Sequence, residues 1–208
     1  IVVEHIKQRG LQAVTVSLDD FYLTKAQRIE LSRTVHPLLR TRGVPGTHDS
    51  QWLGQVLHAL QTANPAEGVT LELPTFDKGM DDRSGQRQVR CQILVLEGWC
   101  VGVQAQSDVS QPINALERTE DTEGRWRSWV NEQTREHYEP LWQCIDYWVQ
   151  LRPPGFAQVV QWRGEQEQQI APDKQMDAQA LQRFIDHYER LTRWQWACAP
   201  HQPGMRVE

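Results

Sequence analysis

The sequence lacks the features that would place it in a secreted, membrane-spanning or nucleic-acid-binding class. Its four cysteines, spread from Cys91 to Cys198, form no CxxC pair, so we expect neither a zinc site nor a disulfide framework, and a reducing cytoplasm is the default location. No apolar run approaches the roughly 20 residues of a membrane span, and no signal-peptide pattern is visible. Because the net charge is −5 and no basic stripe is present, nucleic acid and membranes are not expected partners.

The start of the sequence also lacks a methionine. Residue 1 is Ile, and the first ten residues already have the pattern of a helix, because Val2, Val3 and Ile6 share one face and Gly10 suits the position just past its end. We therefore expect the chain to begin without its natural first segment. The 208 residues fit one domain, which is long enough to bury about 70% of the surface of the unfolded chain.

The sequence does contain an alternation of strand and helix patterns. Predicted strands cover 11–18, 69–76, 91–97 and 156–162, and predicted helices cover 24–34, 50–63, 125–150 and 177–196. Pro140 should kink or split the third of these helices. We interpret 105–124 as a polar loop and 198–208 as a loose tail. The alternation predicts an α/β fold with a mainly parallel sheet.

Three of the predicted strands end in an acid, at Asp19, Asp77 and Glu97. In an open parallel sheet, ligands bind beyond the carboxyl ends of the strands, and there the three carboxylates would share one edge. Asp77 also precedes Lys78, one of only four lysines, although a lone pair of this kind is usually surface charge. One acid after a strand is most often a solvated turn residue, whereas three on one edge favour a functional site.

Two of these acids also have neighbours that suit chemistry. Asp19 and Asp20 precede two aromatic residues, so Asp19 could take a proton from a substrate hydroxyl in a pocket enclosed by aromatic rings. Glu97 follows an apolar run and precedes Gly98, which is the arrangement of a Walker B strand. An acid at that position can hold Mg²⁺ directly or through water, and the glycine allows close approach of the backbone.

Five segments carry a resemblance to a known family. In order along the chain they are "SLDDFYLT", "HPLLRTRGVPGTHD", "LPTFDKGMDDR", "LVLEGWCVG" and "VVQWRGEQE". They resemble the P-loop small-molecule kinases, which include uridine kinase, bacterial pantothenate kinase and phosphoribulokinase, and they are most similar to the D-glycerate 3-kinase branch. The resemblance covers roughly 1–195. It implies a P-loop NTPase-like three-layer α/β/α fold that transfers a phosphoryl group from ATP to a hydroxyl of a small metabolite, with Mg²⁺ as cofactor.

The resemblance also implies a role for each matched residue. Asp19 matches the catalytic base, Glu97 matches the acid near Mg²⁺, and Arg163 resembles an arginine of the lid that closes over the ATP phosphates. The acceptor substrate would be bound by residues of three segments: Asp20, Phe21, Tyr22, Arg42, His48, Asp77, Lys78 and Arg83. A helical region around 105–152 would form the lid and substrate part of the single domain.

The identity of the acceptor is less certain from sequence than the family. An acidic acceptor such as D-glycerate needs cations to bind its carboxylate, and arginine suits that planar group best. Arg42, His48, Lys78 and Arg83 are candidates, and their number favours D-glycerate over pantothenate or a uridine-like acceptor. Each of them, and Arg163, also has a simpler interpretation as a residue that only stabilises its own loop or lies in solvent.

The nucleotide site of this family is built on a GxxxxGK(S/T) loop, whose amides and lysine hold the phosphates. No such motif occurs in this sequence. In the family the loop precedes the helix that 1–10 resembles, so we expect an N-terminally truncated chain without its first strand and phosphate loop. The alternative is a non-catalytic relative that binds a metabolite or a partner protein. A carbohydrate-binding surface made of the nine tryptophans is disfavoured, because most have the helical spacing of core residues.

Overall fold

The structure, a computed structural model, describes residues 1–169, 175–198, 201 and 203–207. Its α-helices are α1 (Val2–Gln8), α2 (Lys25–Thr34), α3 (Ser50–Thr62), α4 (Ala115–Glu120), α5 (Arg125–Gln133), α6 (Glu139–Trp142), α7 (Phe156–Gln168) and α8 (Ala178–Ala197). Its strands are β1 (Ala13–Ser17), β2 (Val69–Asp77), β3 (Asp82–Cys91), β4 (Ile93–Glu97), β5 (Trp148–Leu151) and β6 (Gly204–Val207). Two 3-10 segments cover Leu18–Phe21 and Pro37–Arg40, and a wider π turn covers Thr134–Tyr138.

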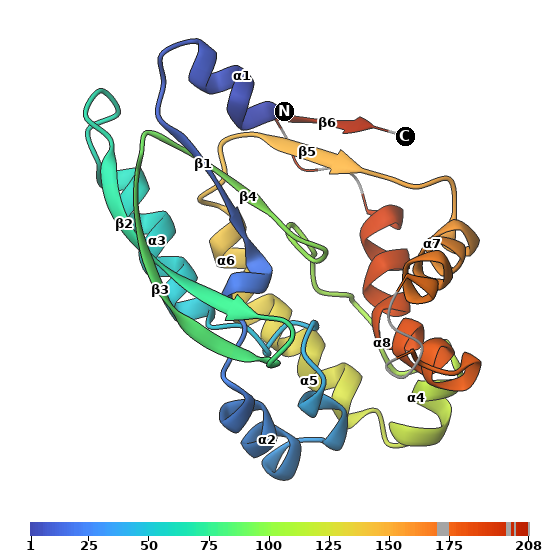
Figure 1. Cartoon of the computed structure of the whole chain (residues 1–208). Helices are drawn as coiled ribbons and strands as arrows, with labels where there is room; N and C mark the ends of the chain where they lie inside the picture. The colour runs from blue at the N-terminus through green and yellow to red at the C-terminus, as the bar shows by residue number, and fades with distance from the viewer. Residues whose placement is uncertain (170–174, 199–200, 202, 208) are drawn as a thin grey trace.

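The strands associate in three pairs. β1 and β4 are parallel, in a register that runs from Ala13 opposite Ile93 to Ser17 opposite Glu97. β5 and β6 are also parallel, whereas β2 and β3 form an antiparallel hairpin. Figure 1 shows β1 and β4 in the middle of the fold, with the hairpin on one side and α7 and α8 on the other. The predicted α/β class with parallel strands is confirmed.

The hairpin corrects one expectation from the sequence. Asp77 ends β2, and β2 pairs only with β3 in the described part of the chain. Asp77 therefore lies outside the sheet of β1 and β4, although its neighbour Lys78 contacts Asp19 just beyond the end of β1. The prediction that Asp77 ends a strand of the parallel sheet is wrong, because an alternating strand pattern does not reveal which strand it will pair with.

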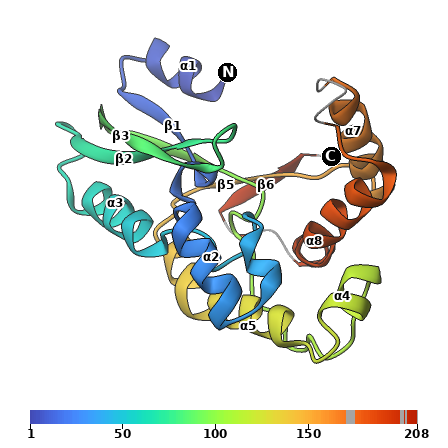
Figure 2. The ribbon, with the colours of Figure 1, turned by 60° about the horizontal axis from the view of Figure 1, so that its bottom comes forward.

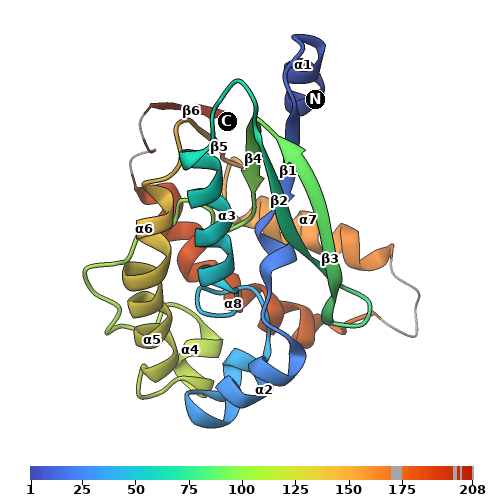
Figure 3. The ribbon, with the colours of Figure 1, turned by 90° about the vertical axis from the view of Figure 1, so that its left-hand side faces the viewer.

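The helix α3 shows how the sequence pattern produces the core. The Asp49 carboxylate accepts a hydrogen bond from the backbone N–H of Trp52, 3.0 Å away, and so begins the helix. Leu53, Val56 and Leu57 recur on one stripe and are all buried. Figure 3 shows α3 running beside α6, and Figure 2 shows α4 lying next to α8. Replacing a core leucine of this kind by alanine typically costs about 2–5 kcal/mol of stability.

Two predicted elements differ in type from those of the structure. The segment 156–162, predicted as a strand, is the first half of α7, because the polar residues that follow continue the helix and Arg163 pairs with Glu167 one turn later at 3.0 Å. The tail, predicted to be loose, forms β6 over Gly204–Val207, since β5 offers it a parallel partner. Residues 199–200, 202 and 208 of that tail lie outside the described residues.

The predicted long helix is shorter than its apolar pattern suggested. α5 ends at Gln133, the π turn follows, and α6 ends at Trp142 before the chain enters β5. Pro140 lies in the first turn of α6, where its missing N–H needs no helical partner. The predicted polar loop 105–124 contains α4, whose cap Asn114 accepts a hydrogen bond from a backbone N–H at 3.0 Å.

Candidate active site

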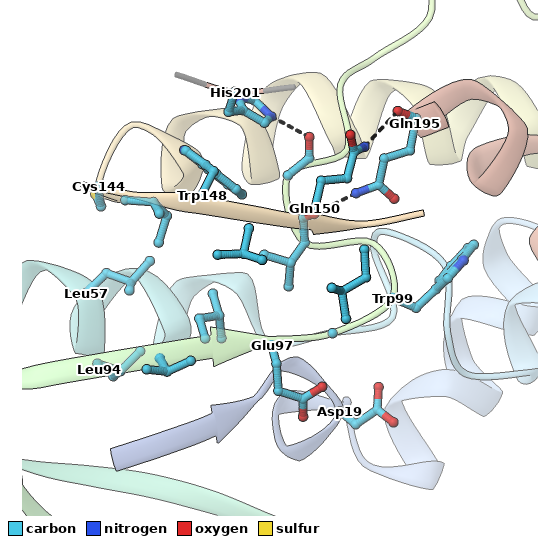
Figure 4. Close-up of a pocket in the computed structure, with 18 of the residues that line it drawn as sticks. Asp19, Leu57, Leu94, Glu97, Trp99, Cys144, Trp148, Gln150, Gln195 and His201 are labelled. Carbon is cyan, nitrogen blue, oxygen red and sulfur yellow. Dashed lines mark hydrogen bonds between the residues drawn. The ribbon is translucent and has the colours of Figure 1, made fainter. Parts of the chain in front are cut away.

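The carboxyl ends of β1 and β4 bring two of the predicted site residues together. β1 ends at Ser17, whose hydroxyl accepts a hydrogen bond from the N–H of Asp19 as the chain turns into the 3-10 segment. Because Ser17 lies opposite Glu97 in the register, Asp19 and Glu97 emerge at the same edge. Figure 4 shows their carboxylates close to one another at one end of a cavity. Gly98 fits here because a Cβ at that position would lie 2.7 Å from the Cβ of Leu18.

Asp19 has two hydrogen-bond donors that hold it in its ionised form. Lys78 places its Nζ 2.7 Å from Oδ2, and the hydroxyl of Tyr22 donates to Oδ1 at 2.9 Å. Burial by itself would raise the pKa of Asp19, but the hydrogen bonds from Lys78 and Tyr22 outweigh it and leave that pKa below its ordinary value. Burial raises the pKa of Tyr22, so its hydroxyl stays protonated as a donor.

The neighbouring carboxyl, Asp20, is held differently. Burial and the nearby charges of Asp19 and Glu97 raise the pKa of Asp20, in spite of the guanidinium of Arg87 at 3.8 Å. Two adjacent carboxyls thus have pKa values shifted in opposite directions, a pattern that separates acid and base roles in active sites. Of the two, Asp19 is the one whose ionised form is stabilised by direct hydrogen bonds, from Tyr22 and Lys78.

Arg42 belongs to a cluster of charged side chains around Asp81. Both Arg42 and the buried Arg28 form ion pairs with the single carboxylate of Asp81. Arg28 also donates to three backbone oxygens and is only 1% exposed, so it serves the fold. The guanidinium of Arg42 lies 5.9 Å from the ring centre of Tyr22 and 5.5 Å from that of Phe76. Arg42 therefore contacts the ring of Tyr22, the residue that donates to Asp19.

Sequence reasoning missed Asp81 and Arg28. Asp81 has a φ of 54°, a conformation that non-glycine residues rarely adopt, and this places its carboxylate under both arginines. Its position within the segment "DKGMDDR" was the available signal, but three acids there gave no reason to choose it. Arg28 lies in a helix whose sequence is mostly polar, and such a pattern does not indicate that one of its residues is buried.

His48 is buried and neutral, which corrects its prediction as a cation. Burial lowers its pKa to about 3. The hydroxyl of Tyr138 accepts a hydrogen bond from the N–H of Gly46 at 2.9 Å and lies 2.8 Å from Nδ1 of His48. The imidazole of His48 and the Tyr138 hydroxyl therefore share one buried hydrogen bond. The ring stacks on Tyr22 at a centroid distance of 4.6 Å and so fixes the residue that donates to Asp19.

Three other predicted substrate residues stabilise the surroundings of the site. Phe21 has no exposed surface, so its prediction as a substrate contact is wrong; its ring packs edge-on against Trp52. Arg83 donates to the backbone oxygen of Tyr22 at 3.1 Å and pairs with Asp49 at 3.3 Å. The carboxylate of Asp77 accepts hydrogen bonds from two backbone N–H groups of the hairpin turn that carries Lys78. These partners give Asp77 and Arg83 structural roles.

One cavity joins the remaining candidates. It has a volume of about 2040 Å³, and six predicted site residues line it: Asp19, Tyr22, Arg42, Lys78, Glu97 and Arg163. Arg163 reaches it from α7, where its guanidinium lies 4.8 Å from the ring centre of Phe184. The cavity continues between β4 and β5, past apolar side chains such as Leu94 and Trp148 (Figure 4). It exceeds the usual 300–1,000 Å³ of a small-ligand pocket, because it includes the apolar stretch between β4 and β5 as well as the polar site.

Glu97 fits a magnesium ion that is shared with phosphates. Its carboxylate is exposed at the end of β4 and forms no ion pair with any described residue. Within the described ranges, no group of three or more His, Cys, Asp or Glu side chains could hold a metal by itself. Mg²⁺ in phosphoryl-transfer sites typically takes one or two carboxylates, and phosphates and waters complete its shell. One free carboxylate beside Asp19 is consistent with that kind of site.

No helix among the described residues has the length and apolar character needed to cross a bilayer. No family model matches the chain. The uncharacterized kinase mug58 of Schizosaccharomyces pombe is 31% identical over 198 residues, which cover 88% of this chain and 70% of the relative. The probable ATP-dependent kinase TDA10 of Saccharomyces cerevisiae is 28% identical over 187 residues, or 83% of this chain. Those residues are 62% of TDA10, so the chain spans less than two thirds of that relative.

A solved structure is similar over nearly the whole chain. The D-glycerate 3-kinase from Cryptococcus neoformans var. grubii superposes with a TM-score of 0.78 and 28% sequence identity. The superposition covers 99% of this chain and 79% of that enzyme. Fold and sequence therefore agree on the same group of relatives, all of them kinases.

Proposed function

Since the chain belongs to the small-molecule kinase family of the D-glycerate 3-kinase and TDA10 type, we propose that it forms the acceptor side of a kinase that phosphorylates a hydroxyl of D-glycerate. The observation that carries the proposal is the position of Asp19. Its carboxylate is held in the ionised form, and it lines one cavity with Arg42, Glu97 and Arg163. This combination supplies a base, a place for an anionic acceptor and a place for phosphates.

Asp19 is the base in this proposal. The acceptor oxygen attacks the γ-phosphorus, and the bond to the leaving oxygen of ADP breaks. The hydroxyl proton moves to Oδ2 of Asp19, the oxygen that Lys78 leaves when it turns towards the acceptor. Tyr22 holds the carboxylate in place during this step, since its hydroxyl donates to Oδ1. General base catalysis of this kind contributes about 10²–10⁴ in rate, and positioning and charge neutralisation supply the rest.

Arg42 binds the carboxylate of the acceptor. Its guanidinium shares Asp81 with Arg28, which leaves donors available for a second anion. Lys78 is the other cation, and its side chain is 65% exposed, so it can move from Asp19 towards an incoming anion. A uridine-like acceptor would need stacking and amide partners in place of these charges.

Arg163 and Glu97 serve the nucleotide. Arg163 lines the cavity from α7 and binds the phosphates of ATP as a bidentate cation. Glu97 would hold Mg²⁺, which when bound neutralises the charge that the phosphates carry. Asp20 is a second carboxyl group next to Asp19. Its pKa is raised by burial and by the charges of Asp19 and Glu97.

The test is a panel of acceptors with one matched variant. The chain, together with whatever its gene encodes before Ile1, is assayed for ADP release with D-glycerate, pantothenate and uridine. D-glycerate is expected to give the highest kcat/KM, and Arg42→Ala should remove most of that preference. Higher kcat/KM with pantothenate or uridine would contradict the acceptor assignment. Binding of an acceptor without transfer to any of them would favour a non-catalytic metabolite-binding protein.

A further inference from the structure

Tyr188 lies on α8 where three parts of the candidate site meet. Its hydroxyl donates a hydrogen bond to the backbone oxygen of Arg42 at 3.0 Å. Its ring packs edge-on against Trp99 with ring centres 4.7 Å apart, and at a tilt of 46° against Phe184 with ring centres 4.9 Å apart. Burial raises the pKa of Tyr188 to about 12, so the hydroxyl is a proton donor at any physiological pH. None of the five segments that carry the family resemblance contains this residue.

The contact with the Arg42 backbone is close. Gly43 has a φ of +134°, a conformation that favours glycine, and a Cβ there would lie 2.7 Å from the ring of Tyr188. The N–H of Gly43 donates to the hydroxyl of Thr47 at 3.0 Å, which ties the two ends of this short loop together. The backbone at 42–43 therefore packs directly against α8, and this contact fixes the backbone position from which the Arg42 side chain extends.

The same face of α8 also contacts Arg163, on the proposed nucleotide side of the site, and Trp99, close to the proposed Mg²⁺ ligand Glu97. Phe184, one turn before Tyr188, supports the guanidinium of Arg163 at 4.8 Å. Thr192, one turn after it, accepts a hydrogen bond from the indole N–H of Trp99 at 2.8 Å, and Trp99 is two residues beyond the strand end at Glu97. Residues spaced by four share one helix face, so α8 presents a single stripe to all three groups.

We propose that Tyr188 is a positioning residue for the acceptor substrate. It acts through Arg42: its hydroxyl fixes the Arg42 backbone, and its ring fixes Gly43, so that the guanidinium stays over Tyr22 beside Asp19. Phe184, one turn earlier on α8, contacts the guanidinium of Arg163. Arg42 and Arg163 are therefore both positioned by contacts with the same helix. This inference rests on the proposed kinase function.

Tyr188→Phe tests the proposal in the full protein, because it removes the hydroxyl and keeps the ring. Losing one neutral hydrogen bond, worth about 0.5–1.5 kcal/mol, should raise the KM for D-glycerate roughly two- to twelvefold. The KM for ATP and kcat should stay within about twofold, since a uniform binding contact has been lost. The control is Thr119→Val, which removes an exposed hydroxyl that bonds only within α4, to the backbone oxygen of Ala115 at 2.9 Å, and it should change nothing.

A double variant and an exchange measurement separate positioning from packing. If Tyr188 acts through Arg42, Tyr188→Phe should add nothing to the acceptor KM in an Arg42→Ala background. Amide hydrogen exchange at Gly43 and Thr47 should be several-fold faster in Tyr188→Phe than in the wild type or the control. An active wild type whose acceptor KM is unchanged by Tyr188→Phe overturns this inference alone. Fully additive effects of Tyr188→Phe and Arg42→Ala on the acceptor KM overturn this inference too. A wild type without phosphoryl transfer overturns both the proposed function and this inference.

Discussion

Lys78 and Asp19 form an ion pair, with Nζ of the lysine 2.7 Å from Oδ2 of the aspartate. The pair joins the turn of the β2–β3 hairpin to the end of β1, two parts of the fold that share no sheet. Lys78 is mostly exposed whereas Asp19 is only 29% exposed, so the lysine is the mobile partner. The predictions below follow from this pair and from the groups around it.

Asp19→Asn should lower kcat about 10²–10⁴-fold, because an amide cannot accept the proton of the acceptor hydroxyl. The fold should survive, since asparagine can still accept the hydrogen bond from Tyr22. Steady-state kinetics with D-glycerate and ATP measure the loss, and Asp20→Asn is the matched control, with a loss expected to stay within about tenfold. Equal losses in the two variants would contradict the assignment of the base to Asp19.

Lys78→Met should move the acidic limb of the kcat/KM profile to higher pH. Burial raises the pKa of Asp19, and the Lys78 hydrogen bond is the first of the contacts that lower it, so removing the lysine lets the pKa rise. The base form exists only above that pKa, and the profile of kcat/KM reports the free enzyme. Lys25→Met, which removes a lysine from the exposed start of α2, should leave the limb in place.

The same shift has a consequence for stability. Because the pKa of Asp19 is lower in the folded chain than its ordinary value of 3.8, the group stabilises the fold above about pH 4 and loses this contribution as the pH falls. Lys78→Met should therefore weaken the acid dependence of unfolding below pH 4 relative to the wild type. An unchanged acid limb together with an unchanged acid dependence would show that the ion pair is not formed in solution.

Arg42→Ala should raise the KM for D-glycerate about 10- to 150-fold, as expected for a lost hydrogen bond to a charged group. The fold should tolerate the change, because Asp81 keeps its ion pair with the buried Arg28. The KM for ATP should change little. Arg33→Ala, at an exposed arginine of α2, is the control. An equal rise in the KM for ATP would place Arg42 on the nucleotide side.

Glu97→Gln should raise the Mg²⁺ concentration needed for half-maximal rate by about tenfold or more, because a neutral amide is a weaker ligand than a carboxylate. Titration of activity with Mg²⁺ at saturating D-glycerate and ATP measures this. The exposed Glu30→Gln on α2 should leave the titration unchanged. A Glu97→Gln protein with a wild-type Mg²⁺ requirement would exclude this residue as a ligand.

His48→Asn should flatten the dependence of stability on pH between about 6.5 and 4. Burial lowers the pKa of His48 to about 3, so the unfolded chain binds a proton in this range that the folded chain does not. At pH 5, 1.5 units below the ordinary value of 6.5, this costs the wild type about 2 kcal/mol.

Urea unfolding at several pH values measures the slope, and the exposed His58→Asn is the control. His36 and His187 are also held below their ordinary pKa by burial, so the wild type should keep part of its slope after the substitution. The difference in slope between wild type and variant is therefore the quantity of interest. A slope that matches the wild type would mean that His48 is protonated in the folded chain.

Local patterns were enough to predict much of the secondary structure. A helix or strand period depends only on residues that are close together in the sequence. For this reason the sequence could predict the apolar stripe of α3, the helix cap at Asp177 and the strand 93–97. The order of the motifs predicted the kinase family, which the relatives confirm. The placement of Asp19 and Glu97 at one edge also followed from the sequence, because both end strands of a parallel pair.

The tertiary structure decided which side chains touch. Whether β2 joined the parallel sheet or formed a hairpin depended on its partner β3, and this placed Lys78 on Asp19. Burial made His48 a neutral support for Tyr22 and removed Phe21 from the cavity, while a left-handed backbone at Asp81 brought one carboxylate to two arginines. Tyr188 entered the site because α8 packs across the chain against 42–43. Sequence periodicity is a local property, whereas charge pairing and desolvation depend on groups far apart in the chain, so only the folded structure could fix them.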